Sequence, residues 1–318
     1  RLSDAEFFWN KDKTQNLVKK VSELKKINFF KGLGTYFDKV QRMRKLGGMI
    51  SDELLISKEK VELSASICKT DLTSDLVGEF PELQGIMGGY FSAQQGFDKD
   101  ICLSITEQYL PIGLDSNVPK KPFSIALSMT DKIDNLVGFF GIDEKPTSSK
   151  DPFALRRVAL GIIRIIIENK KDLKLNDLLN YSIGLYQEQN FTLVNDELKK
   201  DLSNFLKDRF RYYLKEKDIR FDIIEASISN FSTNKLFSSF EKARCVNKII
   251  NNQIGIDITS SYKRASNILQ SEMENKEIEI TNSTDPGIFK SDYEKNLFKK
   301  ITDIKKYYSD IDLSLIHI

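Results

Sequence analysis

The carboxylates that could do chemistry in this chain come in two close pairs. Asp71 and Asp75 are four residues apart, and Asp131 and Asp134 are three apart, so we expect each pair to lie on one face of a helix. Paired carboxylates can bind Mg²⁺. Acidic residues at helical spacing are common, however, and ion pairing is the more frequent explanation. The basic residues that could pair with them are Lys69, Lys132, Arg156 and Arg157.

Histidine chemistry is excluded from nearly the whole chain. The only histidine is His317, the next-to-last residue, so we expect no catalytic triad, no histidine acid–base catalysis and no histidine-rich metal site. Cys68, Cys102 and Cys245 are far apart and predict reduced thiols in a cytoplasmic protein. The GxxxxGK[ST] phosphate loop is also missing. We therefore expect no catalytic residue in this chain.

Basic residues are the stronger functional signal. Between 234 and 270, six basic residues oppose only Glu241 and Asp257, and asparagines are interleaved with them. Arg209 and Arg211 lie beside Phe210 and two tyrosines. Such helices suit RNA phosphates and unstacked bases, although a solvated helix face explains the spacing equally well. The six basic residues are Lys235, Lys242, Arg244, Lys248, Lys263 and Arg264.

The most apolar segment, residues 148–167, predicts a central helix against which other helices pack. Asp151 can cap this helix, and Pro152 suits its first turn. A narrow polar stripe interrupts the apolar surface. It consists of Arg157, Gly161, Arg164 and Glu168. Arginines on such a helix need partners, so we expect a crevice, a bound anion or buried carboxylates beside them.

The remaining periodicity predicts a protein that is nearly all α. Thr35 and Asp38 resemble a capping box. The helix that they begin should bury Phe37, Val40 and Met43, expose Lys39, Arg42 and Lys45, and end at Gly47-Gly48. Further helices are predicted in residues 3–31, 59–80, 98–109 and 122–139 and in several segments beyond 170, with a turn-rich segment at 82–90. Residues 277–280 alternate like a strand. Trp9 is expected to be a packing anchor rather than a base-stacking platform.

Length and charge fit a large helical protein. The chain has 318 residues, a formal net charge of +2 and no apolar run of the ~20 residues that a membrane span needs. We expect four segments: an N-terminal helical segment (1–30), a helical domain (31–170), a helical linker (171–232) and a final helical domain (233–318).

Several long motifs resemble one known family. Residues 71–91, 126–142 and 148–168 read DLTSDLVGEFPELQGIMGGYF, ALSMTDKIDNLVGFFGI and SSKDPFALRRVALGIIRIIIE. These segments are similar to the β subunit of bacterial heterotetrameric glycyl-tRNA synthetase, and the similarity continues through FEKARCVNKII and YKRASNIL. The resemblance implies an internal fragment of a longer subunit. The tail LSLIHI departs from the family pattern.

The resemblance implies that the two kinds of subunit have different roles. In this family the α subunit activates glycine with ATP and Mg²⁺, and the β subunit binds tRNA(Gly), within a cytoplasmic α2β2 heterotetramer. Residues 31–170 resemble a helical domain related to His-Asp (HD) phosphohydrolases, and residues 233–318 the start of an anticodon-binding domain. At the HD metal positions this chain has Asp71 and Asp131 without histidines, which implies a degenerate site that holds no metal.

We therefore expect a tRNA-binding, non-catalytic subunit of glycine–tRNA ligase. In the HD-like domain, the expected tRNA contacts are Lys150, Arg156 and Arg157, whereas Arg164 should be structural. In the anticodon-binding region, the expected contacts are Lys242, Arg244, Lys248, Lys263 and Arg264. Two alternatives remain open: a metal-dependent HD-type phosphohydrolase that uses Asp71 and Asp131, and a purely structural helical scaffold that bridges α subunits.

Overall fold

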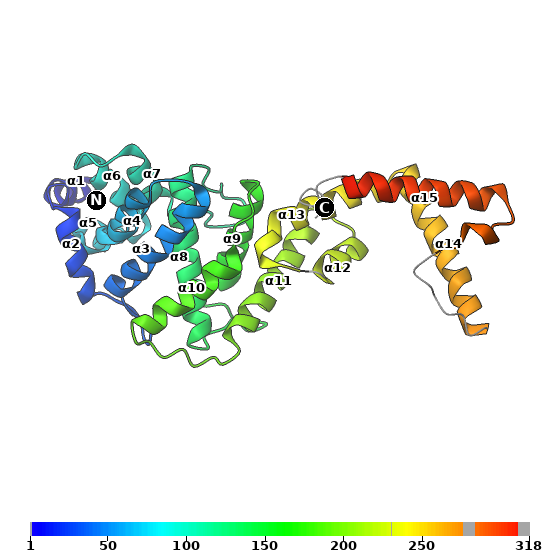
Figure 1. Cartoon of the computed structure of the whole chain (residues 1–318). Coiled ribbons are helices and arrows are strands. Elements are labelled where there is room, and N and C mark those ends of the chain that lie inside the picture. Colours follow the sequence, from blue (N-terminus) through cyan, green and yellow to red (C-terminus); the bar gives the residue numbers. More distant parts are fainter. Residues whose placement is uncertain (1, 230, 276–283, 311–318) are drawn as a thin grey trace. The chain divides into compact units, whose positions relative to one another are not determined.

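The computed structural model describes residues 2–229, 231–275 and 284–310 (Figure 1). These residues are almost entirely helical, and the sheet among them is a small antiparallel hairpin of β1 (Asn28–Phe30) and β2 (Gly34–Thr35). The prediction of an all-α fold is thereby confirmed. The strand-like segment 277–280 and the tail 313–318 lie outside the described residues.

The described residues group into two compact units. The first comprises those within 1–218 and 228–237, and the second those within 219–227 and 238–318. Residues 171–216 pack with the first unit, because α10 (Leu175–Glu188) contacts α3 and α8, and α11 (Leu198–Glu216) contacts α8 and α9. The segment boundaries expected at 30, 170 and 232 stay predictions.

The first unit is built around one buried helix, α8 (Pro122–Gly141). Nearly all of its residues are buried, and helices from both sides of it in the sequence pack against it. The expected central helix, α9 (Leu155–Glu168), is one of these neighbours. The other helices of this unit are α1 (Leu2–Asp12), α2 (Leu17–Lys20), α3 (Tyr36–Leu54), α4 (Lys58–Ile67), α5 (Asp75–Glu79), α6 (Ile86–Gln94) and α7 (Lys99–Glu107), with 3-10 turns η1 (Val21–Lys26), η2 (Thr70–Thr73), η3 (Pro81–Leu83) and η4 (Thr233–Lys235).

Helix α3 begins as predicted and ends later than predicted. The Thr35 hydroxyl accepts a bond from the Asp38 amide, and the Asp38 carboxylate accepts one from the Thr35 amide, which completes the capping box. The helix continues through Gly47 and Gly48 to Leu54. A Cβ at Gly47 would lie 2.9 Å from the Val61 side chain, so this glycine permits close packing against α4 rather than ending the helix.

Several predicted boundaries were wrong because local breaks interrupt the apolar pattern. The helix predicted over 59–80 is three elements, α4, η2 and α5. The second half of the turn-rich segment is the start of helix α6. The helix predicted over 3–31 is divided among α1, α2, η1 and β1. The helices predicted at 98–109 and 122–139 are confirmed as α7 and α8.

Asp151 accepts hydrogen bonds from the first amides of α9, as expected of a capping residue, although the N-cap position itself is Ala154. The Asp151 carboxylate accepts bonds from the amides of Leu155 at 2.8 Å and Arg156 at 3.0 Å. Pro152 is not in the first turn, since Ala154 adopts a left-handed conformation with φ 54° and the helix begins after it. Pro152 therefore belongs to the turn that leads into the helix.

The second unit contains α14 (Gln253–Asn275), η5 (Pro286–Ile288) and α15 (Asp292–Asp310), together with most of α12 (Phe221–Ser229) and α13 (Leu236–Ile250). One of the helices predicted beyond residue 170 is confirmed as α15, along which Tyr293, Leu297 and Ile301 recur at helical spacing. In the described part of the chain, none of the helices has the length and apolar character that crossing a bilayer requires.

The contact between α8 and α10 depends on the absence of a side chain at Gly138. A Cβ there would lie 2.3 Å from the Tyr186 hydroxyl, whereas a Cβ at Gly184, on α10, would meet open space. We expect Gly138→Ala to lower the free energy of unfolding by about 1–3 kcal/mol through overpacking. The matched variant Gly184→Ala should raise it by about 0.5–1 kcal/mol through helix propensity. Urea unfolding measures both, and equal stability of the two variants would contradict this packing.

Candidate functional site

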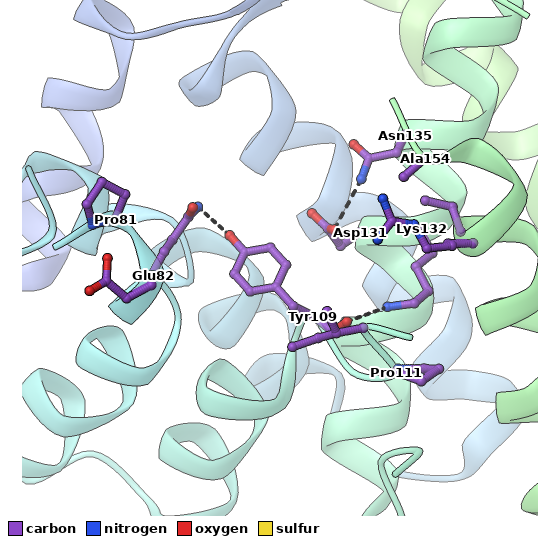
Figure 2. A pocket seen from close by; sticks show the side chains of 12 residues that line it. Pro81, Glu82, Tyr109, Pro111, Asp131, Lys132, Asn135 and Ala154 are labelled. Atoms are coloured by element: carbon purple, nitrogen blue, oxygen red, sulfur yellow. Dashed lines mark hydrogen bonds between the residues drawn. The ribbon is translucent and has the colours of Figure 1, made fainter. Parts of the chain in front are cut away.

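A cavity of about 430 Å³ opens between α8, α9 and the segments around residues 81–84 and 109–112 (Figure 2). Tyr109, Asp131 and Lys132 contribute polar groups to its lining, and Pro111 and Val158 contribute apolar ones. The Gln84 side chain donates a hydrogen bond to the Tyr109 hydroxyl across one side of the cavity. The cavity is therefore a polar recess with apolar edges.

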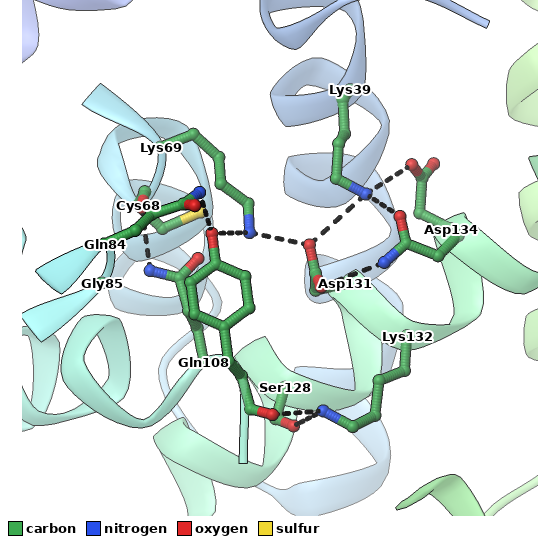
Figure 3. Close-up of polar contacts among 12 residues, drawn as sticks. Lys39, Cys68, Lys69, Gln84, Gly85, Gln108, Ser128, Asp131, Lys132 and Asp134 are labelled. Carbon is green, nitrogen blue, oxygen red and sulfur yellow. Dashed lines mark hydrogen bonds and ion pairs between the residues drawn. The ribbon is translucent and has the colours of Figure 1, made fainter. Parts of the chain in front are cut away.

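Behind this recess lies a buried charge cluster of five residues: Lys39, Arg42, Lys69, Asp131 and Asp134. Figure 3 shows Lys39, Lys69, Asp131 and Asp134. Each is at most 4% exposed. Lys39 and Arg42 come from α3, the two aspartates come from α8, and Lys69 follows α4. Charges that are this deeply buried must compensate one another, because an unpaired charge in a protein interior costs several kcal/mol.

Asp131 is held by two ammonium groups. Lys69 Nζ lies 2.8 Å from its Oδ1, and Lys39 Nζ lies 3.3 Å from the same oxygen. Asn135 Nδ2 donates to the other oxygen at 3.2 Å. Burial alone would raise the pKa of Asp131, but the two ammonium groups hold it well below its ordinary value.

Asp134 is held by a guanidinium and shares Lys39 with Asp131. Arg42 Nε and Nη2 donate to its two oxygens at 2.7 and 3.2 Å, a bidentate arrangement. Lys39 Nζ donates at 3.1 Å. Burial opposes ionisation of Asp134, and Arg42 and Lys39 overcome it to lower the pKa. Arg42 also bonds to Tyr186 of α10, so the cluster ties three helices together.

The sequence did not predict two of the five members of this cluster. Lys39 and Arg42 were expected to be exposed on α3, yet both are 1% exposed. Of the four partners suggested for the aspartates, only Lys69 forms an ion pair with one of them in the described structure. One signal was present: Lys39 and Arg42 are three residues apart, as are Asp131 and Asp134, so two helices can match charges along one face.

Lys132 and Arg164 stabilise the loop that forms one wall of the recess. Lys132 Nζ donates to the carbonyls of Tyr109 and Leu110 at 3.2 and 2.8 Å. Burial lowers the pKa of Lys132 to about 8. The Arg164 guanidinium donates to the carbonyls of residues 113, 114 and 116 at 2.8–2.9 Å and pairs with Glu168 at 2.7 Å. The polar stripe of α9 therefore faces this loop.

Asp71 and Asp75 do not share a helix face, contrary to expectation, because they lie in η2 and α5. Asp71 is fully buried and accepts bonds from the amides of Gly85 at 2.6 Å and Gly88 at 3.2 Å, at the start of α6. Burial raises its pKa to about 6. Asp75 is exposed and pairs with Lys11.

These residues do not fit a divalent cation. Asp131 faces two ammonium groups, and the bonded oxygen of Asp71 faces backbone amides. Across residues 2–229, 231–275 and 284–310, no three histidine, cysteine, aspartate or glutamate side chains come together in a way that could hold a metal ion. Burial raises the pKa of the neighbouring Cys68 thiol to about 12, so this thiol is a packing group rather than a nucleophile.

The tRNA contacts expected in the first unit lie around the start of α9. Lys150 is exposed in the preceding loop, and Arg156 donates to the carbonyls of Thr147 and Lys150. Arg157 is exposed and lines the recess, the only one of these three to do so. Their role in tRNA binding stays a prediction.

The basic residues expected to bind tRNA in the second unit lie on two helices. On α13, Lys248 is exposed, Lys242 is half-buried, and Arg244 pairs with Glu241 at 2.6 Å. On α14, Lys263 and Arg264 are both exposed. Their role in tRNA binding also stays a prediction.

Of the three aromatic residues beside Arg209 and Arg211, only Tyr212 is exposed, at 37%, and the Arg209 guanidinium lies 5.8 Å from the centre of its ring. Phe210 is fully buried and Tyr213 is 5% exposed, so both belong to the core. Trp9 stacks on Phe91 with ring centroids 5.4 Å apart, which agrees with a packing role.

The pair of Lys69 and Asp131 should dominate the stability of the first unit. Lys69→Met leaves a buried carboxylate with one cation fewer, so we expect a loss of about 3–5 kcal/mol in the free energy of unfolding. In a cycle with Asp131→Asn, the coupling energy should exceed about 1 kcal/mol. Lys200→Met, in an exposed pair with Glu197, should change stability far less. Additive effects of Lys69→Met and Asp131→Asn would contradict the pairing.

Asp71 should make stability depend on pH in an unusual direction. Its folded pKa of about 6 lies above the ordinary value of 3.8, so between these values the folded protein holds a proton that the unfolded chain releases. Its contribution is therefore complete below pH ~4 and is lost as the pH rises through ~6, by about 3 kcal/mol. Asp71→Asn should remove this slope from unfolding free energies measured between pH 4.5 and 7.

Ser74→Ala provides the control for that measurement. Ser74 caps α5 through the Val77 amide at 3.2 Å and does not titrate in this range. Its loss should shift the whole curve by a constant amount, typically ~1 kcal/mol. If the Asp71→Asn profile ran parallel to that of the unmodified protein, the environment assigned to Asp71 would be wrong.

Comparison with known proteins identifies the family. The family model described as glycyl-tRNA synthetase beta subunit matches residues 1–229. Glycine–tRNA ligase beta subunits from Rickettsia canadensis and Cereibacter sphaeroides are 38% and 35% identical over 299 and 302 residues, each alignment covering 94% of this chain. The corresponding subunit of Rhodospirillum centenum is 37% identical over 275 residues, or 86% of the chain.

The chain spans less than half the length of these relatives, with 42%, 43% and 38% of them covered. The matches nevertheless run through both units of the fold. On these findings, the chain belongs to the glycyl-tRNA synthetase beta subunit family.

Proposed function

We propose that this chain binds tRNA(Gly) as part of the β subunit of glycine–tRNA ligase. The observation that carries the proposal is the exposed basic surface of α13 and α14, in a chain that belongs to this family. Lys248, Lys263 and Arg264 are exposed, and no ion pair or hydrogen bond engages their side chains within the described residues. Cations that have no partner in the protein can bind RNA phosphates. Such contacts position an RNA without reading its bases.

In this proposal the chain does no bond-making chemistry itself. The α subunit activates glycine with ATP and Mg²⁺ and transfers it to the tRNA, within a cytoplasmic α2β2 assembly. The β subunit holds the tRNA in place for that reaction. The first unit, with Lys150, Arg156 and Arg157 on its surface, provides a second group of positive charges for the same RNA.

We further propose that the first unit is an HD-like domain in which ammonium groups occupy the place of the metal ion. The support is the geometry at Asp131, where the ammonium groups of Lys39 and Lys69 contact the same carboxylate oxygen, at 3.3 and 2.8 Å, in the place of a metal ion. This arrangement gives no support to a metal-dependent phosphohydrolase that uses Asp71 and Asp131. A purely structural scaffold differs from our proposal in one respect: it would not retain tRNA.

Reversal of the charges at Lys263 and Arg264 tests the proposed interface. The double change to Glu should weaken tRNA(Gly) binding and reduce the slope of log K against log salt by about 2, because two phosphate contacts are lost. Nitrocellulose filter binding over a series of salt concentrations measures both quantities. Circular dichroism should show an unchanged helix content, since both residues are exposed.

The matched control is the double change of Lys199 and Lys200 to Glu on α11. These are also adjacent exposed lysines, and they lie outside the proposed interface, so the salt slope should stay that of the unmodified chain. If the α14 variant bound tRNA at low salt as tightly as this control, the placement of the interface would be wrong. If the unmodified chain did not retain tRNA, the scaffold alternative would be favoured.

A further inference from the structure

The recess beside α9 has a rigid wall before any ligand enters it. Lys132 and Arg164, from two different helices, together hold five backbone carbonyls of the loop over residues 109–116. Lys69 donates to the Tyr109 hydroxyl at 2.8 Å, and its ammonium lies 4.0 Å from the centre of the Tyr109 ring. A site that is held in this way costs little conformational entropy when a ligand binds.

Most polar groups that line the recess are already engaged by the protein. Lys132 donates to two carbonyls and to Ser128, and Asn135 bridges Asp131 and Lys39. Two side chains at the exposed edge differ from these. The guanidinium of Arg157 and the carboxylate of Glu82 have no ion pair or hydrogen bond with any described residue. A ligand would therefore meet a free cation and a free acceptor.

The net charge of the buried groups behind this loop also favours the binding of an anion. The buried charge cluster has three cations and two carboxylates, Asp71 adds a third carboxylate, and Lys132 adds a fourth cation. The balance is four positive against three negative groups, and Arg157 and Glu82 at the edge add one charge of each sign. Because each of these groups is already bonded, to an opposite charge or to backbone groups, the net field is modest. We therefore expect weak binding of any small anion alone.

We propose that this recess holds one unstacked nucleotide, with its phosphate on Arg157 and its base in the cavity. The volume of about 430 Å³ lies in the range of ~300–1,000 Å³ that ligand sites occupy. Pro111, Ile112 and Val158 offer apolar surface to the base, and Tyr109 lies beside them. Glu82 can accept a hydrogen bond from a ribose hydroxyl or a base amino group.

The nucleotide can belong to an RNA strand or be free in solution, and the recess chemistry is the same for both. The inference that it belongs to RNA rests on the proposed function. Proteins read single-stranded RNA by taking unstacked bases into such recesses. Attachment to an RNA held elsewhere on the protein would raise the effective concentration of the nucleotide and compensate for a weak site.

The test uses the full chain with two variants that change the recess in different ways. Arg157→Gln removes the free cation, and Val158→Trp fills the cavity from a half-buried position on α9. Arg157→Gln should weaken tRNA(Gly) binding about tenfold or more, the typical loss for one charged hydrogen bond. Val158→Trp should weaken it to a similar extent, because the base no longer fits. The matched controls are Arg44→Gln, an exposed arginine near Glu62 on the α3 side, and Val194→Trp, an exposed valine after α10. Both controls should bind tRNA as the unmodified chain does.

A second arm titrates the four nucleoside 5′-monophosphates into the same proteins and follows Tyr109 and Val158 by NMR. Shifts in the unmodified chain that disappear in Arg157→Gln support the recess as a nucleotide site. If these shifts are seen but tRNA does not bind, the nucleotide site is supported and the proposed tRNA-binding function is contradicted. If tRNA binds the unmodified chain, both variants and both controls equally, the inference is overturned and the proposed function stands. If neither tRNA nor any monophosphate binds, both are overturned.

Discussion

Two carboxylates on one face of α8 set the main constraint on this fold. Asp131 and Asp134 are 4% and 0% exposed, so the elements packed against that face must supply positive charge. Helix α3 supplies Lys39 and Arg42, and the end of α4 supplies Lys69. The desolvation of these groups is compensated only if all of them stay in place. The relative positions of α3, α4 and α8 are therefore fixed by charge pairing as well as by apolar packing.

The first unit uses its buried and half-buried cations for two purposes. Lys39, Arg42 and Lys69 neutralise buried acids, whereas Lys132 and Arg164 bind backbone carbonyls and fix a loop. Arg157 lies beside these groups and is engaged by neither kind of partner among the described residues. In a unit that binds its buried cations so completely, an uncommitted arginine at the edge of a recess is the group available to an external anion. This contrast links the packing of the first unit to its proposed role.

A structural feature of this chain could be predicted from the sequence where neighbouring residues determine it, and not where a distant segment does. The capping box at Thr35 and the cap at Asp151 were predictable because they are local hydrogen bonds. Gly47 and Gly48 were misinterpreted as a helix end because their purpose, close approach of α4, depends on a different segment. The burial of Lys39 and Arg42 was missed for the same reason, since a lysine that faces water and one that faces an aspartate have the same helical spacing. The family resemblance identified the family but did not provide these partners.

In the proposed HD-like domain, the ammonium groups of Lys39 and Lys69 fill the place beside Asp131 that a metal ion would otherwise take. Crystals grown in Mn²⁺ and measured at the manganese absorption edge test this arrangement directly. We predict no anomalous density within coordination distance of Asp131 and clear density for the side chains of Lys39 and Lys69 against its oxygen. A manganese peak between Asp131 and its neighbours, with either lysine displaced, would contradict the account.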